Sequence, residues 1–74
     1  MDPHHMVHMA NQIALNFGAY SREEAIDKVY THLRMFWEPR MRKQLHTYVE
    51  NGGSGLHEFV VEAEKRLKAA VAAP

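Results

Sequence analysis

The chain has no cysteine among its 74 residues, and this absence excludes several kinds of chemistry at once. It rules out disulfides, thiolate nucleophiles, and zinc or iron–sulfur sites held by cysteine. A chain of this length forms one domain, whose core alone supplies only roughly 3–5 kcal/mol. Small domains are otherwise reinforced by a metal or by association, so we expect this one to bind a larger partner.

Long apolar runs and an excess of charge of one sign are also missing. No stretch approaches the roughly 20 apolar residues that cross a bilayer, and the N-terminus lacks the basic-then-apolar order of a secretory signal. Nine basic and nine acidic residues give a formal net charge of zero and a pI near 7.0. These features argue against a membrane or a nucleic acid as its partner, and the absence of cysteine fits the cytosol.

Apolar residues recur with the period of an α-helix over almost the whole chain. They make up 46% of the residues, which is enough for a folded core rather than a disordered chain. The spacing predicts an all-α fold, a small bundle of about four short amphipathic helices. We expect these helices near residues 5–17, 21–37 and 39–50, and from residue 56 onward.

Residues with distinctive backbone preferences mark the breaks between these helices. Gly18 is placed to cap the end of the first helix, and Ser21 with Glu24 forms a capping box at the start of the second. Pro39 forces a sharp corner after Trp37 and suits the first position of a third helix. The breaks therefore predict short connections and adjacent helices.

The glycine-rich segment 51–55 is the clearest loop. A phosphate-binding loop would need a strand before it and a lysine after its glycines, so we interpret it as a flexible connector with Ser54 capping the next helix. We expect a single helical domain over residues 1–74. Residues 1–5 are then an expression remnant or a disordered start, and residues 72–74 a frayed tail.

Six histidines raise the question of a metal site. His4 and His8 are spaced to share one helix face, but no further ligand is placed to complete a zinc site. His57 and Glu58 begin like the HExxH motif of zinc proteases, yet Val61 stands where the second histidine is needed. We therefore expect exposed polar histidines on helix surfaces, with no metal and no cofactor.

The charged residues form spacings typical of solvated helix faces rather than of acid–base sites. Neither of the two serines lies in a nucleophile motif, so we predict no catalytic residue. We expect three ion pairs at i,i+4 spacing: Glu24 with Lys28, Glu62 with Arg66, and Glu64 with Lys68.

One segment, residues 34–43, combines four basic residues with the only tryptophan. Aromatic residues and arginine are enriched at interface hot spots, so we predict that Trp37, Arg40 and Arg42 contact a partner. Phe36 continues the apolar stripe of its helix and is expected in the core, whereas Trp37 is equally compatible with core and interface.

The two arginines lie about 160° apart on a helix, so they cannot face one partner equally. We expect Arg40 to be the anchor and Arg42 to tie down the corner or to pair with Glu38.

Three apolar residues do not lie on the apolar faces of the predicted helices: Leu15, Met35 and Val61. They support docking only if the fold brings them together. Leu15 and Met35 are included among the predicted partner contacts.

Several segments resemble the delta subunit of bacterial NAD-dependent formate dehydrogenase. They are Met-Ala-Asn-Gln-Ile-Ala at 9–14, His-Leu-Arg at 32–34, Phe-Trp-Glu-Pro-Arg-Met-Arg at 36–42, and Gly-Gly-Ser-Gly-Leu at 52–56. The resemblance spans roughly residues 6–63, and Glu38 stands where the family more often has aspartate.

The resemblance implies a cytoplasmic, non-catalytic accessory subunit of a molybdenum- or tungsten-containing formate dehydrogenase. In that family the larger subunits hold the pterin, the iron–sulfur clusters and the flavin, and the delta subunit binds none of these. The partner is then the larger catalytic subunit, whose assembly, cofactor insertion or stability the chain would support. Two alternatives stay open: a self-associating helical protein, and a small nucleic-acid-binding module, which the neutral charge disfavours.

Overall fold

The computed structural model describes residues 2–72, and the chain forms four α-helices over that range. No strand occurs within this part of the chain, so the predicted all-α fold is confirmed. None of these helices is long and apolar enough to cross a membrane. The helices are α1 (Pro3–Asn16), α2 (Arg22–Phe36), α3 (Pro39–Glu50) and α4 (Glu58–Ala72).

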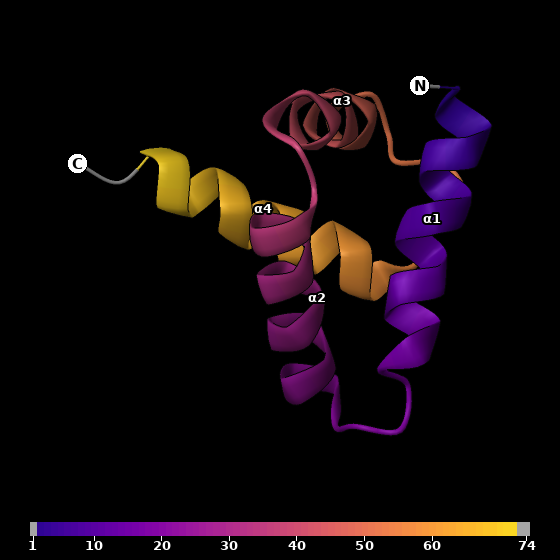
Figure 1. Ribbon diagram of the computed structural model, residues 1–74, viewed down its shortest axis with the longest axis vertical. Helices are drawn as coiled ribbons and strands as arrows, with labels where there is room; N and C mark the ends of the chain where they lie inside the picture. The colour runs from indigo at the N-terminus through magenta and orange to yellow at the C-terminus, as the bar shows by residue number, and fades with distance from the viewer. Residues whose placement is uncertain (1, 73–74) are drawn as a thin grey trace.

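The central packing is between α2 and α4, which share more contacts than any other pair of helices. Figure 1 shows α4 crossing α2, while α1 runs beside α2 and is joined to it by a short turn. At the other end of α2 the chain turns sharply into α3, which packs against α4. The bundle is therefore arranged around one crossing rather than as four parallel rods.

The core consists of the apolar stripes that the periodicity predicted. On α1 the buried residues recur at the spacing of one helix face, and α2 and α4 do the same. Only one residue of α3 is fully buried, so α3 lies at the margin of the core. The buried cluster contains Met6, Ala10, Ile13, Ala14, Ile26, Val29, Leu33, Trp37, Leu45, Val60 and Ala63.

The helix starts follow local capping chemistry. Ser21 caps α2 because its hydroxyl accepts a hydrogen bond from the backbone N–H of Glu24 at 3.3 Å, as predicted. Asp2 caps α1 in the same way, so α1 begins at Pro3, two residues earlier than expected. Gly18 follows the C-cap residue Phe17, and its N–H donates to the carbonyl of Leu15 in the last turn of α1, although its backbone φ is not positive.

The loop between α3 and α4 is held by specific hydrogen bonds, contrary to the prediction of a flexible connector. The Asn11 side chain of α1 donates to the carbonyl of Gly55 at 2.9 Å and accepts from the N–H of His57 at 2.8 Å. Ser54 does not cap α4, which begins at Glu58; the Nδ1 atom of His57 accepts from the helix backbone instead. Three glycines of this loop have positive φ, which other residues adopt only with strain.

The three predicted i,i+4 ion pairs do not form in the described chain, because their members contact other residues instead. Arg66 of α4 reaches across to α2 and bonds Glu23 at 3.0 Å and Asp27 at 3.7 Å. The crossing of α4 over α2 brings these charges together, which spacing along one helix does not reveal. The remaining residues of the predicted pairs also have different partners: Glu24 bonds Ser21, Lys28 lies over Tyr20, Glu62 pairs with Lys65, Glu64 with His46, and Lys68 with Glu50.

The end of α2 reverses the expectation for its two large aromatic residues. Trp37 is 5% exposed and belongs to the core, whereas Phe36 is 71% exposed, so its prediction as a core residue is wrong. Trp37 extends the buried row of Val29 and Leu33 at four-residue steps. Phe36, the last residue of α2, lies about 60° to the side of Leu33 in that row, and the ring of His32 packs against it.

This arrangement predicts that truncating two neighbouring aromatic residues changes the free energy of unfolding by very different amounts. Trp37→Ala should cost roughly 3–5 kcal/mol of unfolding free energy, because it empties a core position. Phe36→Ala should stay within about 0.5 kcal/mol, because the side chain is mostly in solvent. Chemical denaturation followed by far-UV circular dichroism measures both, and equal destabilisation by the two variants would contradict the assigned core.

Candidate docking site

The corner between α2 and α3 is made by three consecutive residues. Trp37 and Glu38 both have extended backbones, and Pro39 then occupies the first position of α3. An extended residue before proline avoids the clash with the proline ring. The corner therefore forms where the sequence placed it.

Arg42 fastens this corner from the α3 side. Its Nη1 atom donates to the carbonyl oxygen of Trp37 at 2.7 Å and to that of Arg34 at 2.9 Å. Carbonyls at the end of a helix lack partners within the helix, and a positive charge there is favourable. Of the two roles considered for Arg42, the structure shows the first: it ties α2 to α3 and does not pair with Glu38 within the described chain.

Arg40 stands apart from these contacts. It is exposed and makes no hydrogen bond or ion pair with the residues that the structure describes. Met35 and Phe36, in the last turn of α2, are 69% and 71% exposed. We call Met35, Phe36 and Arg40 the corner surface; methionine, aromatic residues and arginine are the types enriched at interfaces.

Trp37 and Leu15, the other predicted contacts besides Arg42, do not add to the corner surface. Trp37 has its ring in the core. Leu15 is 61% exposed but lies beside the turn into α2, whereas Met35 lies at the opposite end of that helix, about 20 Å away along its axis. Val61 is half-buried against Gly53 of the α3–α4 loop. The fold therefore does not bring Leu15, Met35 and Val61 together.

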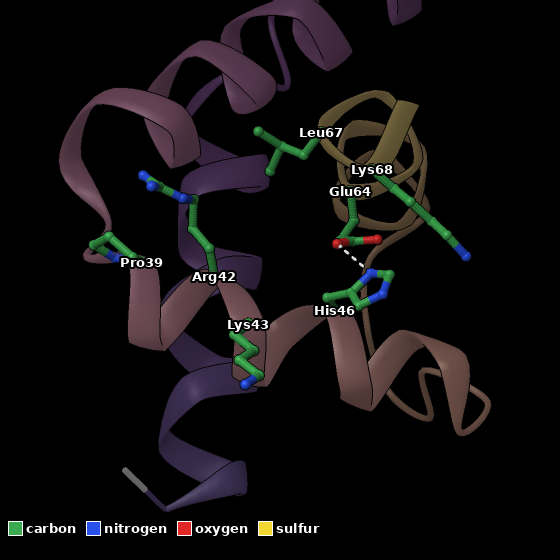
Figure 2. A pocket seen from close by; sticks show the side chains of 7 residues that line it. All are labelled: Pro39, Arg42, Lys43, His46, Glu64, Leu67 and Lys68. Atoms are coloured by element: carbon green, nitrogen blue, oxygen red, sulfur yellow. Dashed lines mark hydrogen bonds and ion pairs between the residues drawn. The ribbon is translucent and has the colours of Figure 1, made fainter. Parts of the chain in front are cut away.

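A pocket of about 430 Å³ opens between α3 and α4, directly beside the corner (Figure 2). Its two walls belong to separate helices, so the spacing of residues along the sequence does not predict it. Two of its lining residues, Pro39 and Arg42, also build the corner. The lining comprises Pro39, Arg42, Lys43 and His46 from α3, and Glu64, Leu67 and Lys68 from α4.

One buried carboxylate lies in this pocket. Glu64 is only 4% exposed, and its Oε1 lies 3.0 Å from Nδ1 of His46 (Figure 2). The other ring nitrogen of His46 contacts Glu50, which also lies 3.8 Å from Lys68. Burial raises the pKa of Glu64, and His46 and Lys68 oppose that rise without cancelling it. A histidine bridging two glutamates thus links α3 to α4.

The histidines divide between surface and structural roles, so the prediction that all are exposed is wrong in part. His4, His5 and His8 are exposed, whereas His32, His46 and His57 are half-buried. Two of the half-buried group have structural contacts: the bridge of His46 and the cap of His57. Within the described residues no three potential ligands are grouped for a metal ion.

Most of the chain matches one protein family. The family model described as the NADH-dependent formate dehydrogenase delta subunit, FdsD, matches residues 5–63. The chain belongs to the FdsD family. No curated protein and no solved structure matches it. In this FdsD chain the matched residues include most of α1, all of α2 and α3, the corner and the start of α4. Asn11 of the first signature segment bonds Gly55 of the last.

The contacts of Arg42 in this FdsD chain predict a difference between the two corner arginines. Arg42→Met should destabilise the fold by about 1–2 kcal/mol, because it leaves two helix-end carbonyls without their charged donor. Arg40→Met should change stability by less than about 0.5 kcal/mol, since Arg40 has no such contact. Urea denaturation compares them directly, and equal stabilities would show that Arg42 does not fasten the corner.

The raised pKa of Glu64 predicts a pH-dependent loss of stability. A carboxyl whose pKa is higher in the folded state binds its proton more tightly there, so stability falls as pH rises above the ordinary glutamate value of 4.5 toward the raised pKa. Glu64→Gln removes that titration. Its melting temperature should therefore rise relative to that of the original chain across this pH range, and the difference between the two should stay constant at higher pH. Glu62→Gln, a more exposed change on the same helix, is the control; identical pH curves for Glu64→Gln and the original chain would contradict the burial.

Proposed function

We propose that this FdsD chain is a non-catalytic accessory subunit in the cytoplasm. It docks on the larger catalytic subunit of a formate dehydrogenase and supports the assembly, cofactor insertion or stability of that complex. The match of residues 5–63 to the delta subunit family carries this proposal.

Three polar side chains with catalytic potential are used in the fold, which agrees with an accessory role. Ser21 caps α2, and His57 caps α4. His46 is held between Glu50 and Glu64. Both ring nitrogens of His46 are therefore occupied by carboxylates, and neither is left to exchange a proton with a substrate.

The chain forms a compact framework. Its radius of gyration is 11.3 Å, which agrees with about 11 Å for a compact domain of this length. The corner surface of Met35, Phe36 and Arg40 is presented on this framework, with Arg42 holding the corner beneath it. A preformed surface reduces the ordering cost of binding, so we propose that the corner surface contacts the catalytic subunit with Arg40 as its anchor.

Charge reversal at Arg40 tests this contact. Arg40→Glu should lower recovery of the catalytic subunit by at least about tenfold if Arg40 meets a carboxylate there. It should not unfold the chain, because an acidic residue in the first turn of α3 is favourable. The measurement is co-purification of the tagged chain with the catalytic subunit, together with melting curves of the free chain.

Arg22→Glu is the matched control, because Arg22 is an exposed arginine in the first turn of α2, at the far end of that helix. It should leave recovery unchanged. Full recovery with Arg40→Glu would remove the corner surface from the interface. A chain that binds no catalytic subunit and forms stable homo-oligomers by light scattering would instead support the self-associating alternative.

A further inference from the structure

The pocket between α3 and α4 has an apolar surface with a cationic rim. Leu67 and Pro39 contribute apolar surface, and Arg42, Lys43 and Lys68 contribute three permanent positive charges. The only carboxylate in the lining, Glu64, is buried and bonded to His46. A local excess of positive charge therefore exists in a chain whose formal net charge is zero.

The two lysines of the rim are available to an incoming group. In the view of Figure 2, Lys43 on α3 and Lys68 on α4 lie on either side of His46. Lys43 is exposed and makes no hydrogen bond or ion pair within the described residues. Lys68 has a single distant ion pair, 3.8 Å from Glu50, and its side chain is 61% exposed. Such a pair at the surface holds the lysine only weakly.

The third cation has a different part. The Nη1 atom of Arg42 donates to the carbonyls of Trp37 and Arg34, so Arg42 fixes the α3 wall of the pocket to the end of α2. The bond between His46 of α3 and Glu64 of α4 joins the two walls of the pocket. Contacts within the chain thus hold both walls in place, whereas Lys43 and Lys68 on the rim are free, or nearly free, to bind a ligand.

We infer that this pocket receives an acidic segment of the catalytic subunit, which places one apolar side chain against Leu67 and carboxylates beside Lys43 and Lys68. The inference rests on the proposed function and extends the interface from the corner surface to α4. Apolar insertion with flanking charge pairs is the usual composition of a protein–protein contact, in which the buried anchor supplies affinity and the rim charges supply orientation.

Charge reversal of the rim tests the inference in the full chain. The double variant Lys43→Glu/Lys68→Glu should weaken binding to the purified catalytic subunit by roughly 30-fold or more, since two attractive pairs become repulsive. The control Arg22→Glu/Lys65→Glu changes the net charge equally but alters residues outside the pocket, and it should bind like the original chain. Titration by biolayer interferometry gives Kd for each, with melting curves to confirm folding.

Carbodiimide coupling identifies the occupant, because it joins a lysine amine to a carboxylate in direct contact. Mass spectrometry of the coupled complex should show Lys43 or Lys68 joined to aspartate or glutamate of the catalytic subunit. Coupling of these lysines to a second copy of the chain, or no coupling in a complex that forms, would overturn the inference.

The outcomes separate the pocket from the proposed function. If Arg40→Glu weakens binding and the rim variant binds fully, the pocket is not part of the interface and the proposed function stands. If the original chain does not bind the catalytic subunit, both are overturned.

Discussion

The crossing of α4 over α2 is the contact on which the rest of the structure depends. The buried residues of α2, from Ala25 to Leu33, face a core to which α4 adds Val60 and Ala63. The ion pairs of Arg66 with Glu23 and Asp27 reinforce the same crossing at its surface. Because a 74-residue chain has little apolar area to spare, α1 and α3 each attach to this pair rather than form a core of their own.

The candidate interface follows from that arrangement. Pro39 ends α2 early, so the corner exposes Phe36 and directs α3 back toward α4. The pocket is the space left where these two helices approach each other without full contact, since only Leu45 of α3 is completely buried. Arg42 and Arg40 illustrate the result. Arg42 is fixed to the end of α2, whereas Arg40, two positions earlier, is exposed and makes no hydrogen bond or ion pair with the described residues.

Membership of the FdsD family and the geometry bear on different parts of the function. The family match assigns the chain to a formate dehydrogenase complex, and the structure shows which polar groups serve the fold. His46 and Glu64 look like a catalytic pair by residue type, yet their bond joins α3 to α4 beneath a cationic rim. A docking function agrees with such a division, because the framework is fastened internally and the free charges lie at the surface.

The sequence by itself determined the helices, because apolar period, the Ser21 cap and the Pro39 break act within a few residues. It also carried the family signature. The tertiary structure decided which charges pair, that Trp37 rather than Phe36 is buried, and that a pocket lies beside Glu64. The physical reason is that periodicity defines a helix face but not the partner that crosses it. Arg66 bonds Glu23, 43 positions away in the sequence, because α4 lies across α2.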